Sequence, residues 1–333
     1  MFTLHPVEVK STEQLAQFCA APGLPILDPQ AVARHNADAH WMIVDEADNV
    51  SARCSLWWRE VPPYPEQSLG VIGHYAAQNA AAASKLLNLA GERLAVQKCT
   101  LAVGPMNGNI WRSYRLVVQR SSEPPYFLEP DNPDDWPAHF TENGFSVFSE
   151  YFSTLNPDLS QSQPDLSRIS ERIQQRGIQL RSFRLDDFDQ ELRHIYELSL
   201  ASFAQNFLYT PIDLAEFISA YQPIRPYIQP DLILIAEHDK RVAGFLFALP
   251  DLLQAQHGTP INTIIIKTVA VHPADQMLGL GNLLVARAEQ IAYELGYKRA
   301  IHALMHQANS SRKISQRHET RQIRQYALFS KPL

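Results

Sequence analysis

One glycine-containing segment has residue types and spacing suited to binding a ligand. Gln276, Gly279 and Gly281 form a Q-x-x-G-x-G pattern within residues 271–288, after an apolar β-branched run and before an amphipathic one. Glycine weakens a helix by about 1 kcal/mol relative to alanine, so its presence at a helix entrance needs a reason. A helix N-terminus binds anions through its unpaired amides, and glycine lets a phosphate approach the backbone. The pattern predicts a phosphate or pyrophosphate site.

Two widespread phosphate-binding patterns do not fit this segment. A dinucleotide fingerprint needs G-x-G-x-x-G, but the third glycine position counted from Gly279 holds Leu284. A P-loop closes with Gly-Lys-Ser or Gly-Lys-Thr, and the sequence contains neither tripeptide. The segment instead resembles a third kind of phosphate-binding loop, which lies between a strand and a long helix and holds the pyrophosphate of coenzyme A in a known enzyme superfamily.

The elements around the motif alternate between strand and helix patterns, which predicts an α/β or α+β layered domain. Strands are predicted at residues 177–183, 261–271, 298–306 and 323–333, with a further strand pair in 231–251 around a turn at 238–240. Helices are predicted at residues 185–206, 211–221, 279–297 and 309–317.

This order resembles the N-acetyltransferases of the GNAT superfamily from about Gly177 to the C-terminus. The segment "TVAVHPADQMLGLGNLLVARAEQIAYELGY" is similar to their strand, Q/R-x-x-G-x-G/A loop and long helix, and "AIHALMHQAN" and "YALFSKPL" follow in the superfamily's order. The resemblance implies acetyl-CoA as co-substrate and no metal. It also implies that the strand before the loop splays from its neighbour and pairs with the pantetheine arm.

On this chain the resemblance implies a set of coenzyme contacts. The strand contacts are Val269, Ala270 and Val271, and the pyrophosphate is wrapped by the loop residues Gln276, Met277, Leu278, Gly279, Leu280, Gly281 and Asn282. Asn309 and Arg312 resemble the start of the superfamily's coenzyme-contacting helix, where Arg312 would reach a phosphate. Many members carry Arg or Lys in the loop, whereas this loop is uncharged and follows the acidic Asp275.

Both usual catalytic positions of the superfamily are empty here. The third strand has Lys267 and no glutamate to act as base, and the predicted short helix after Asn309 has no tyrosine to act as acid. His306, at the end of its strand, is the candidate base. His302 is expected on the same strand face. Tyr326 is the candidate acid, and both positions also suit ordinary strand residues.

Other residues are candidates for the acceptor side of the site. Tyr209 lies in the segment where GNAT enzymes contact the acceptor. Aromatic residues in two loop-like stretches line either an acceptor pocket or, as the plainer alternative, the interface between the halves. These residues are Trp111, Tyr114, Tyr126, Phe127 and Trp136.

The N-terminal half repeats the order of elements, so we predict a diverged internal copy. Residues 41–62, 68–76, 83–97, 99–109 and 144–155 correspond to strand pair, third strand, helix, fourth strand and closing strand. The helix entrance of this copy lacks glycine, which predicts loss of the ligand. The predicted division is a degenerate GNAT-like domain at 1–157, a linker at 158–176 and a coenzyme-binding domain at 177–333. Each domain is expected to be a mixed, mostly antiparallel twisted sheet flanked by helices.

Composition limits the class of protein. The 333 residues are 45% hydrophobic and 19% charged, with a net charge of -6 and no long basic block, which disfavours nucleic-acid binding. Cys19, Cys54 and Cys99 are too far apart for a metal site or a disulfide framework. With no signal-peptide pattern and no apolar run of membrane-spanning length, we expect a soluble cytoplasmic protein that does not bind membranes.

These features predict an N-acetyltransferase. It would transfer the acetyl group of acetyl-CoA to an amine of a small molecule or peptide, by direct attack in a ternary complex. Two alternatives remain open on the sequence: a non-catalytic, coenzyme A-binding sensor or scaffold, and an enzyme that uses a longer acyl-CoA. A homodimer is one option for the assembly.

Overall fold

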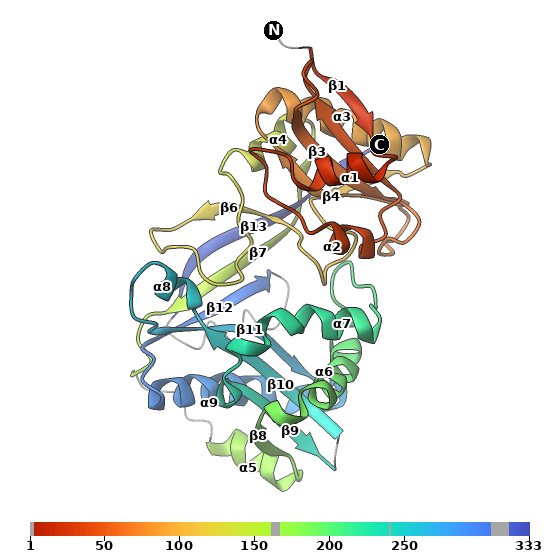
Figure 1. Cartoon of the computed structure of the whole chain (residues 1–333). Helices are drawn as coiled ribbons and strands as arrows, with labels where there is room; N and C mark the ends of the chain where they lie inside the picture. Colours follow the sequence, from red (N-terminus) through yellow and green to blue (C-terminus); the bar gives the residue numbers. More distant parts are fainter. Residues whose placement is uncertain (1–2, 161–166, 240, 308–319) are drawn as a thin grey trace.

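The computed structural model describes residues 3–160, 167–239, 241–307 and 320–333. A single thirteen-stranded sheet runs through both halves of this part of the chain, in the order β1-β2-β3-β4-β5-β13-β7-β12-β11-β10-β9-β8, with β6 beside β13 (Figure 1). The strands are β1 (His5–Glu8), β2 (Ala39–Val44), β3 (Val50–Trp57), β4 (Leu69–Ala77), β5 (Leu101–Gly104), β6 (Leu116–Arg120), β7 (Ser146–Asn156), β8 (Gln179–Ser182), β9 (Ile233–His238), β10 (Arg241–Pro250), β11 (Thr263–Val271), β12 (Arg299–His306) and β13 (Arg321–Pro332).

Helices cover both faces of this sheet. They are α1 (Thr12–Cys19), α2 (Pro29–Arg34), α3 (Ala80–Val96), α4 (Trp136–Glu142), α5 (Ser167–Gln175), α6 (Phe188–Phe203), α7 (Leu214–Tyr221), α8 (Leu252–Gln256) and α9 (Leu280–Glu294), with short 3-10 turns η1 (Leu185–Asp187), η2 (Gln222–Tyr227), η3 (Pro230–Leu232) and η4 (Pro273–Leu278). The predicted mixed, mostly antiparallel sheet flanked by helices is confirmed. The helix predicted at 309–317 lies outside the described residues.

The two halves have matching topology, as the internal repeat predicts. In each half, five strands follow one another in chain order from the outer edge of the sheet toward its centre, β1 to β5 in one half and β8 to β12 in the other. Each half contains one parallel pair, β4 with β5 and β11 with β12. A long helix connects the two strands of each parallel pair, α3 in one half and α9 in the other. The sheet order is therefore symmetrical about its centre, between β13 and β7.

The closing strands are exchanged between the halves. β7 belongs to the N-terminal half in sequence but pairs with β12, and β13 belongs to the C-terminal half but pairs with β5 and β6. β7 and β13 also pair with each other over most of their length (Figure 1). The predicted boundary therefore divides the chain in sequence, whereas each half of the sheet is completed by a strand from the other.

Alternating side chains of the C-terminal strands supply two apolar layers, because successive residues of a strand point to opposite faces. Phe245 and Phe247 of β10 pack toward α6 and α7, whereas Leu246 and Ala248 pack toward α9. The helix α9 buries Leu280, Leu284, Ala288 and Ala292 at a spacing of four residues. This helix is thereby held across the strands that flank the glycine motif.

The predicted linker is partly structured. Residues 167–175 form α5, whose Ile173 is buried in the same apolar cluster as α9. The polar composition of the segment conceals the apolar pair Ile169 and Ile173, which lie one helical turn apart on α5.

No helix in the described part of the chain is long and apolar enough to span a bilayer.

Candidate active site

The parallel strands β11 and β12 separate partway along their length. Their ladder runs from Thr263 to Ile266 on β11, and there the pairing between these two described strands ends. β11 continues to Val271 and β12 continues to His306. The side chains of β11 change from buried to half-exposed at Lys267, where the separation begins.

The separation leaves a backbone edge of β11 facing β12. Val269, Ala270 and Val271 still pair with β10 on their other side. Backbone groups on an unpaired strand edge bind an extended partner as an additional strand would. The three residues predicted to contact pantetheine therefore lie on an edge suited to such a partner.

The glycine motif forms the turn between β11 and α9. Gly279 is the N-cap residue of α9 and provides no side-chain hydrogen bond to the helix. Its φ of +80° is a left-handed conformation, which favours glycine. Gly281 lies in the first helical turn, where amides lack intrahelical carbonyl partners. The amide of Asn282 instead donates to the Gly279 carbonyl at 3.1 Å. Gln276, Met277 and Leu278 lie in η4, just before the helix.

The acidic residue beside the motif is neutralised by an ion pair. Asp275 is mostly buried, and Nη2 of Arg241 on β10 lies 2.7 Å from its Oδ2. An isolated carboxylate at this position would repel a phosphate at the start of α9. The loop therefore presents less negative charge than its sequence indicates.

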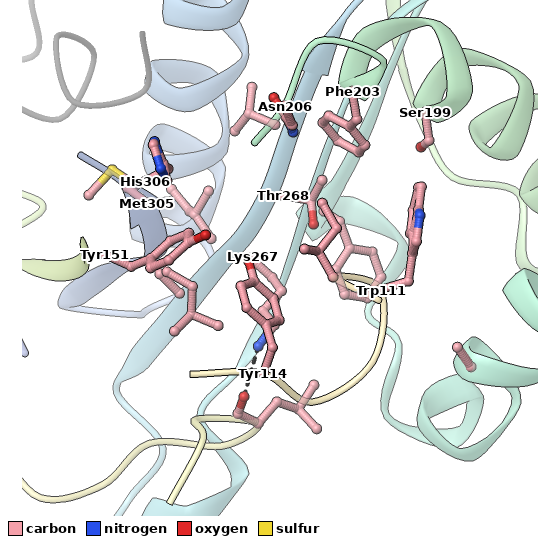
Figure 2. A pocket seen from close by; sticks show the side chains of 18 of the residues that line it. Trp111, Tyr114, Tyr151, Ser199, Phe203, Asn206, Lys267, Thr268, Met305 and His306 are labelled. Atoms are coloured by element: carbon pink, nitrogen blue, oxygen red, sulfur yellow. Dashed lines mark hydrogen bonds between the residues drawn. The ribbon is translucent and has the colours of Figure 1, made fainter. Parts of the chain in front are cut away.

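A cavity of about 450 Å³ lies beside the separated strands. Its lining is mainly aromatic and aliphatic and comes from both halves of the chain. The C-terminal half contributes β11, β12, α6 and α7, and the N-terminal half contributes Trp111, Tyr114, Arg115, Leu128 and Tyr151. Figure 2 shows Trp111, Tyr114 and Tyr151 beside Lys267 and Thr268 of β11. An open strand edge, the N-terminus of α9 and an adjoining cavity are thus combined in one region.

This arrangement agrees with the family comparison. Residues 192–314 match the family profile described as "Acetyltransferase (GNAT) family". This match is consistent with a GNAT superfamily protein. The match covers β11, the glycine loop, α9 and β12.

Individual proteins resemble the chain over more of its length. The "Bacterial ceramide synthase" of Caulobacter vibrioides (strain NA1000 / CB15N) is 24% identical over 277 residues, which cover 76% of this chain and 71% of that protein. "Protein YghO" of Escherichia coli (strain K12) is 22% identical over 154 residues, which cover 46% of this chain but 39% of its own length. A solved "Tandem GNAT protein from the clavulanic acid biosynthesis pathway" superposes with a TM-score of 0.50 at 12% identity, covering 99% of this chain and 98% of that one. At 12% identity, this superposition shows that the two proteins share a fold.

His306, the predicted base, lies at the end of β12 and lines the cavity. Its Nε2 lies 2.8 Å from Oγ of Ser149, and its ring contacts those of Tyr151 and Phe207. Burial, followed by the charge of Arg115, lowers the pKa of His306. The imidazole is therefore neutral near pH 7, as a proton acceptor must be.

His302 does not share a strand face with His306, so this prediction was wrong. A β-bulge places Ala303 and Leu304 opposite the single residue Ser153, with Leu304 at φ +60°. One extra residue reverses the alternation of side chains. His302 consequently lies 3.0 Å from the buried Glu289 of α9.

Tyr326, the predicted acid, is fully buried in a polar network. Its hydroxyl donates to Oε1 of Glu129 at 2.8 Å and also contacts the hydroxyls of Tyr126 and Ser153. Burial raises the pKa of Tyr326 well above its usual range. Because the side chain does not line the cavity, this geometry argues against an acid role and favours a structural one.

The acceptor-side candidates divide between the cavity and the core. Tyr209 lines the cavity, and its hydroxyl donates to the Leu200 carbonyl at 3.4 Å. Trp111 and Tyr114 also line it. The remaining aromatic residues pack elsewhere: Tyr126 in the network of Tyr326, Phe127 against Tyr227, and Trp136 against Tyr75. Asn309 and Arg312 lie outside the described residues.

Two cationic residues of the cavity were not predicted to be functional. Lys267 interrupts the apolar run of β11, at the strand where the superfamily often has a glutamate. Arg115 comes from the N-terminal half, is 8% exposed, and lies over the rings of Tyr114 and Tyr151 at 4.1 and 4.3 Å from their centroids. The lysine inside a β-branched strand was a usable signal, whereas no local pattern marks Arg115.

The equivalent opening in the N-terminal half is filled by the chain itself. β4 and β5 also stop pairing early, after Val71. The amide of Met106 then donates to the Ile72 carbonyl at 2.8 Å, and Asn107 accepts from the His74 amide at 2.6 Å. A Cβ on Gly73 would lie 2.1 Å from the Met106 carbonyl oxygen. This backbone occupies the edge that β11 leaves open, which supports the predicted loss of ligand binding.

The described residues contain no cluster of three or more histidine, cysteine, aspartate or glutamate side chains placed to bind a metal ion.

Proposed function

We propose that the protein is an N-acetyltransferase that transfers the acetyl group of acetyl-CoA to a primary amine. The observation that carries this proposal is the separation of β11 from β12 directly before the left-handed Gly279 and the start of α9. An open strand edge followed by an anion-binding helix start matches, in order, the amide-rich pantetheine and the pyrophosphate of coenzyme A.

The residues around this opening fit the coenzyme. Val269, Ala270 and Val271 would bind the pantetheine arm through their backbone groups. The amides of Gly279, Leu280 and Gly281 would bind the pyrophosphate, with Arg241 removing the repulsion of Asp275. A thioester at the end of the arm would then lie between β11 and β12, beside the cavity.

The cavity supports direct attack in a ternary complex. The acceptor-side residues Trp111 and Tyr209 and the strand residues Thr268 and Val269 line the same space, so an amine and a thioester bound there would be adjacent. The three cysteines are buried in the N-terminal half and do not line the cavity, which disfavours a cysteine acyl intermediate. The acceptor would be the amine of a small molecule or peptide.

A longer acyl group is the second candidate. An acetyl group fills only a small part of about 450 Å³, and the lining is largely apolar. A relative named as a bacterial ceramide synthase covers 76% of the chain. Either a longer acyl donor or an apolar amine acceptor would use this additional space.

Turnover distinguishes these candidates from each other and from a non-catalytic coenzyme-binding protein. Release of the coenzyme A thiol is followed with acetyl-CoA and acyl-CoAs of increasing chain length, each against alkylamines, amino acids and a peptide N-terminus. The proposal predicts amine-dependent thiol release with acetyl-CoA. Release only with longer acyl-CoAs establishes the second candidate, and coenzyme binding with no release from any pair establishes the non-catalytic alternative.

A further inference from the structure

Lys267 occupies the position on β11 where the two parallel strands begin to separate. We propose that Lys267 is the general base of the acyl transfer and that the N-terminal half holds it in place through the Leu128 carbonyl. This assignment rests on the proposed function and concerns the same cavity.

A β-bulge places the side chain. Phe247 of β10 pairs with Thr268 and Ala248 pairs with Ile266, so Lys267 is an extra residue in β11 without a counterpart on β10. A bulge redirects a side chain and is frequent beside active sites. Here the bulge coincides with the last pair between β11 and β12, and Lys267 lines the cavity together with Thr268.

A contact from the other half fixes the ammonium position. Nζ of Lys267 donates to the Leu128 carbonyl at 2.7 Å, as the dashed line in Figure 2 shows. Leu128 has φ +62°, a left-handed conformation that non-glycine residues rarely adopt. A neutral amine that donates one N–H to this carbonyl keeps its lone pair for a proton.

The charges around Lys267 favour its neutral form. Arg115 faces it from the N-terminal half, and the structure shows no hydrogen-bond partner among the described residues for Nε and Nη1 of that guanidinium. The opposing carboxylate, Glu129, is engaged by Arg324 at 2.9 Å and by Tyr326. The other titratable residues that line the cavity are Tyr114, Tyr151, Tyr209, Tyr221, His302 and His306. Burial is the main cause that lowers the pKa of Lys267 to about 7, and the charge of Arg115 lowers it further, whereas the charge of Glu129 raises it.

The reaction balances with this residue as base. The amine nitrogen forms a bond to the thioester carbon, and the carbon–sulfur bond breaks. Neutral Lys267 takes the proton that the attacking nitrogen loses, and the departing thiolate receives a proton from the resulting ammonium. Lys267 thus returns to its neutral form, and the products are an amide and coenzyme A.

His306 is the competing base, and position separates the two. Lys267 lies at the residue where the strands begin to separate, whereas His306 lies at the far end of β12 with its Nε2 at 2.8 Å from Ser149. A base must reach the proton of the attacking amine. The structure therefore favours Lys267.

Three variants test this assignment: Lys267→Met, Lys267→Arg and His306→Asn. Each is assayed for thiol release from acetyl-CoA with the amine that the wild-type protein uses fastest. General bases typically contribute about 10²–10⁴-fold to the rate. We expect kcat to fall by at least about 100-fold in both Lys267 variants, because arginine retains the charge but does not deprotonate. We expect His306→Asn to retain at least about a tenth of the wild-type kcat.

The pH profile provides a readout that a structural role of Lys267 would not change. Wild-type kcat should rise with pH through an apparent pKa near 7, and this limb should be absent from Lys267→Arg. Competitive acetylation of the wild-type lysines by acetic anhydride, mapped by mass spectrometry, should show Lys267 deprotonating near pH 7. Thermal unfolding with acetyl-CoA checks that each variant folds and binds.

The outcomes are distinguishable. Lys267→Arg with kcat within about threefold of the wild type, or a pH limb that disappears only in His306→Asn, overturns the assignment while the proposed function stands. Wild-type protein that binds acetyl-CoA but transfers its acetyl group to no amine overturns the proposed function and the base assignment together.

Discussion

Arg112 and Glu216 form a two-pronged ion pair that joins the halves of the chain. Nε of Arg112 lies 2.6 Å from Oε1 of Glu216, and Nη2 lies 3.0 Å from Oε2. Arg112 follows the cavity residue Trp111, and Glu216 lies on α7 beside the cavity residue Phe217. The pair therefore fixes the position of two cavity walls that come from different halves.

Glu216→Gln should destabilise the protein and loosen the cavity. The Arg112 side chain is mostly buried and that of Glu216 is partly exposed. Hydrogen bonds between charged groups contribute about 1.5–3 kcal/mol, so we expect a loss of about 1.5 kcal/mol in urea unfolding. KM for the acceptor should rise as well. Glu197→Gln, an exposed carboxylate on α6, is the matched control and should stay within about 0.5 kcal/mol of wild type. Equal effects of the two variants would show that the ion pair contributes nothing specific.

Arg241→Met should weaken acetyl-CoA binding. The change leaves the Asp275 carboxylate unpaired beside the proposed pyrophosphate site, and screened repulsion of this kind corresponds to about a three- to fivefold rise in Kd. Titration calorimetry at low and moderate salt measures it. Adding Asp275→Asn to the same variant should restore the affinity. If the double variant binds as weakly as Arg241→Met, then Arg241 acts by another route.

Gly73→Ala should unfold the N-terminal half. Its Cβ would lie 2.1 Å from the Met106 carbonyl oxygen, so the backbone that fills the opening beside β4 would have to move. Overpacking costs about 1–3 kcal/mol, and a backbone clash places this variant at the upper end or beyond. Gly91→Ala, within α3, meets only Leu333 at 3.5 Å and should be neutral or stabilising by up to about 1 kcal/mol. A stable Gly73→Ala would mean that the opening is not filled.

The N-terminal half should lose stability in acid. His74 is buried and lies 2.8 Å from both His35 and Ser55, and burial, followed by the nearby His35, His40, Arg53 and Arg112, lowers its pKa to about 2. The unfolded chain, with a histidine pKa of about 6.5, binds the extra proton below that pH. This contribution to stability is therefore complete above about pH 6.5 and is lost as pH falls toward 2, by about 1.4 kcal/mol per pH unit.

His74→Asn isolates that contribution. Asparagine tolerates the left-handed backbone at this position, φ +46°. The free energy of unfolding, measured in urea at pH 4.5 to 8, should depend less steeply on pH in the variant than in the wild type. An unchanged slope would assign the acid sensitivity to other groups.

Local patterns in the sequence predicted the elements around the opening. The β-branched run and the glycines of residues 261–281 predicted β11, the turn and α9, because strand preference and a left-handed glycine are set by neighbouring residues. Alternation and helical spacing likewise predicted β9, β10, α6 and α7. The internal repeat was predicted because the same order of strand and helix patterns occurs in each half of the sequence.

Local sequence patterns did not predict the pairing of distant strands or the positions of β-bulges. The exchange of β7 and β13 depends on contacts between strands more than 160 residues apart, which neither strand encodes alone. The bulge at Leu304 depends on pairing with β7, so the facing of His302 could not be inferred by counting residues. Arg115 became part of the site only because the two halves pack together.

The most direct test of the account is thermal unfolding with saturating acetyl-CoA, beside NADH and ATP as controls. A ligand at about a hundred times its Kd stabilises the folded state by about 2.7 kcal/mol, so we predict a higher Tm with acetyl-CoA alone. Gly279→Val should abolish this shift, whereas Gly258→Ala, at an exposed glycine with φ +74°, should retain it. An unchanged wild-type Tm in acetyl-CoA, or an equal shift in Gly279→Val, would contradict the assignment of the glycine turn as a coenzyme A site.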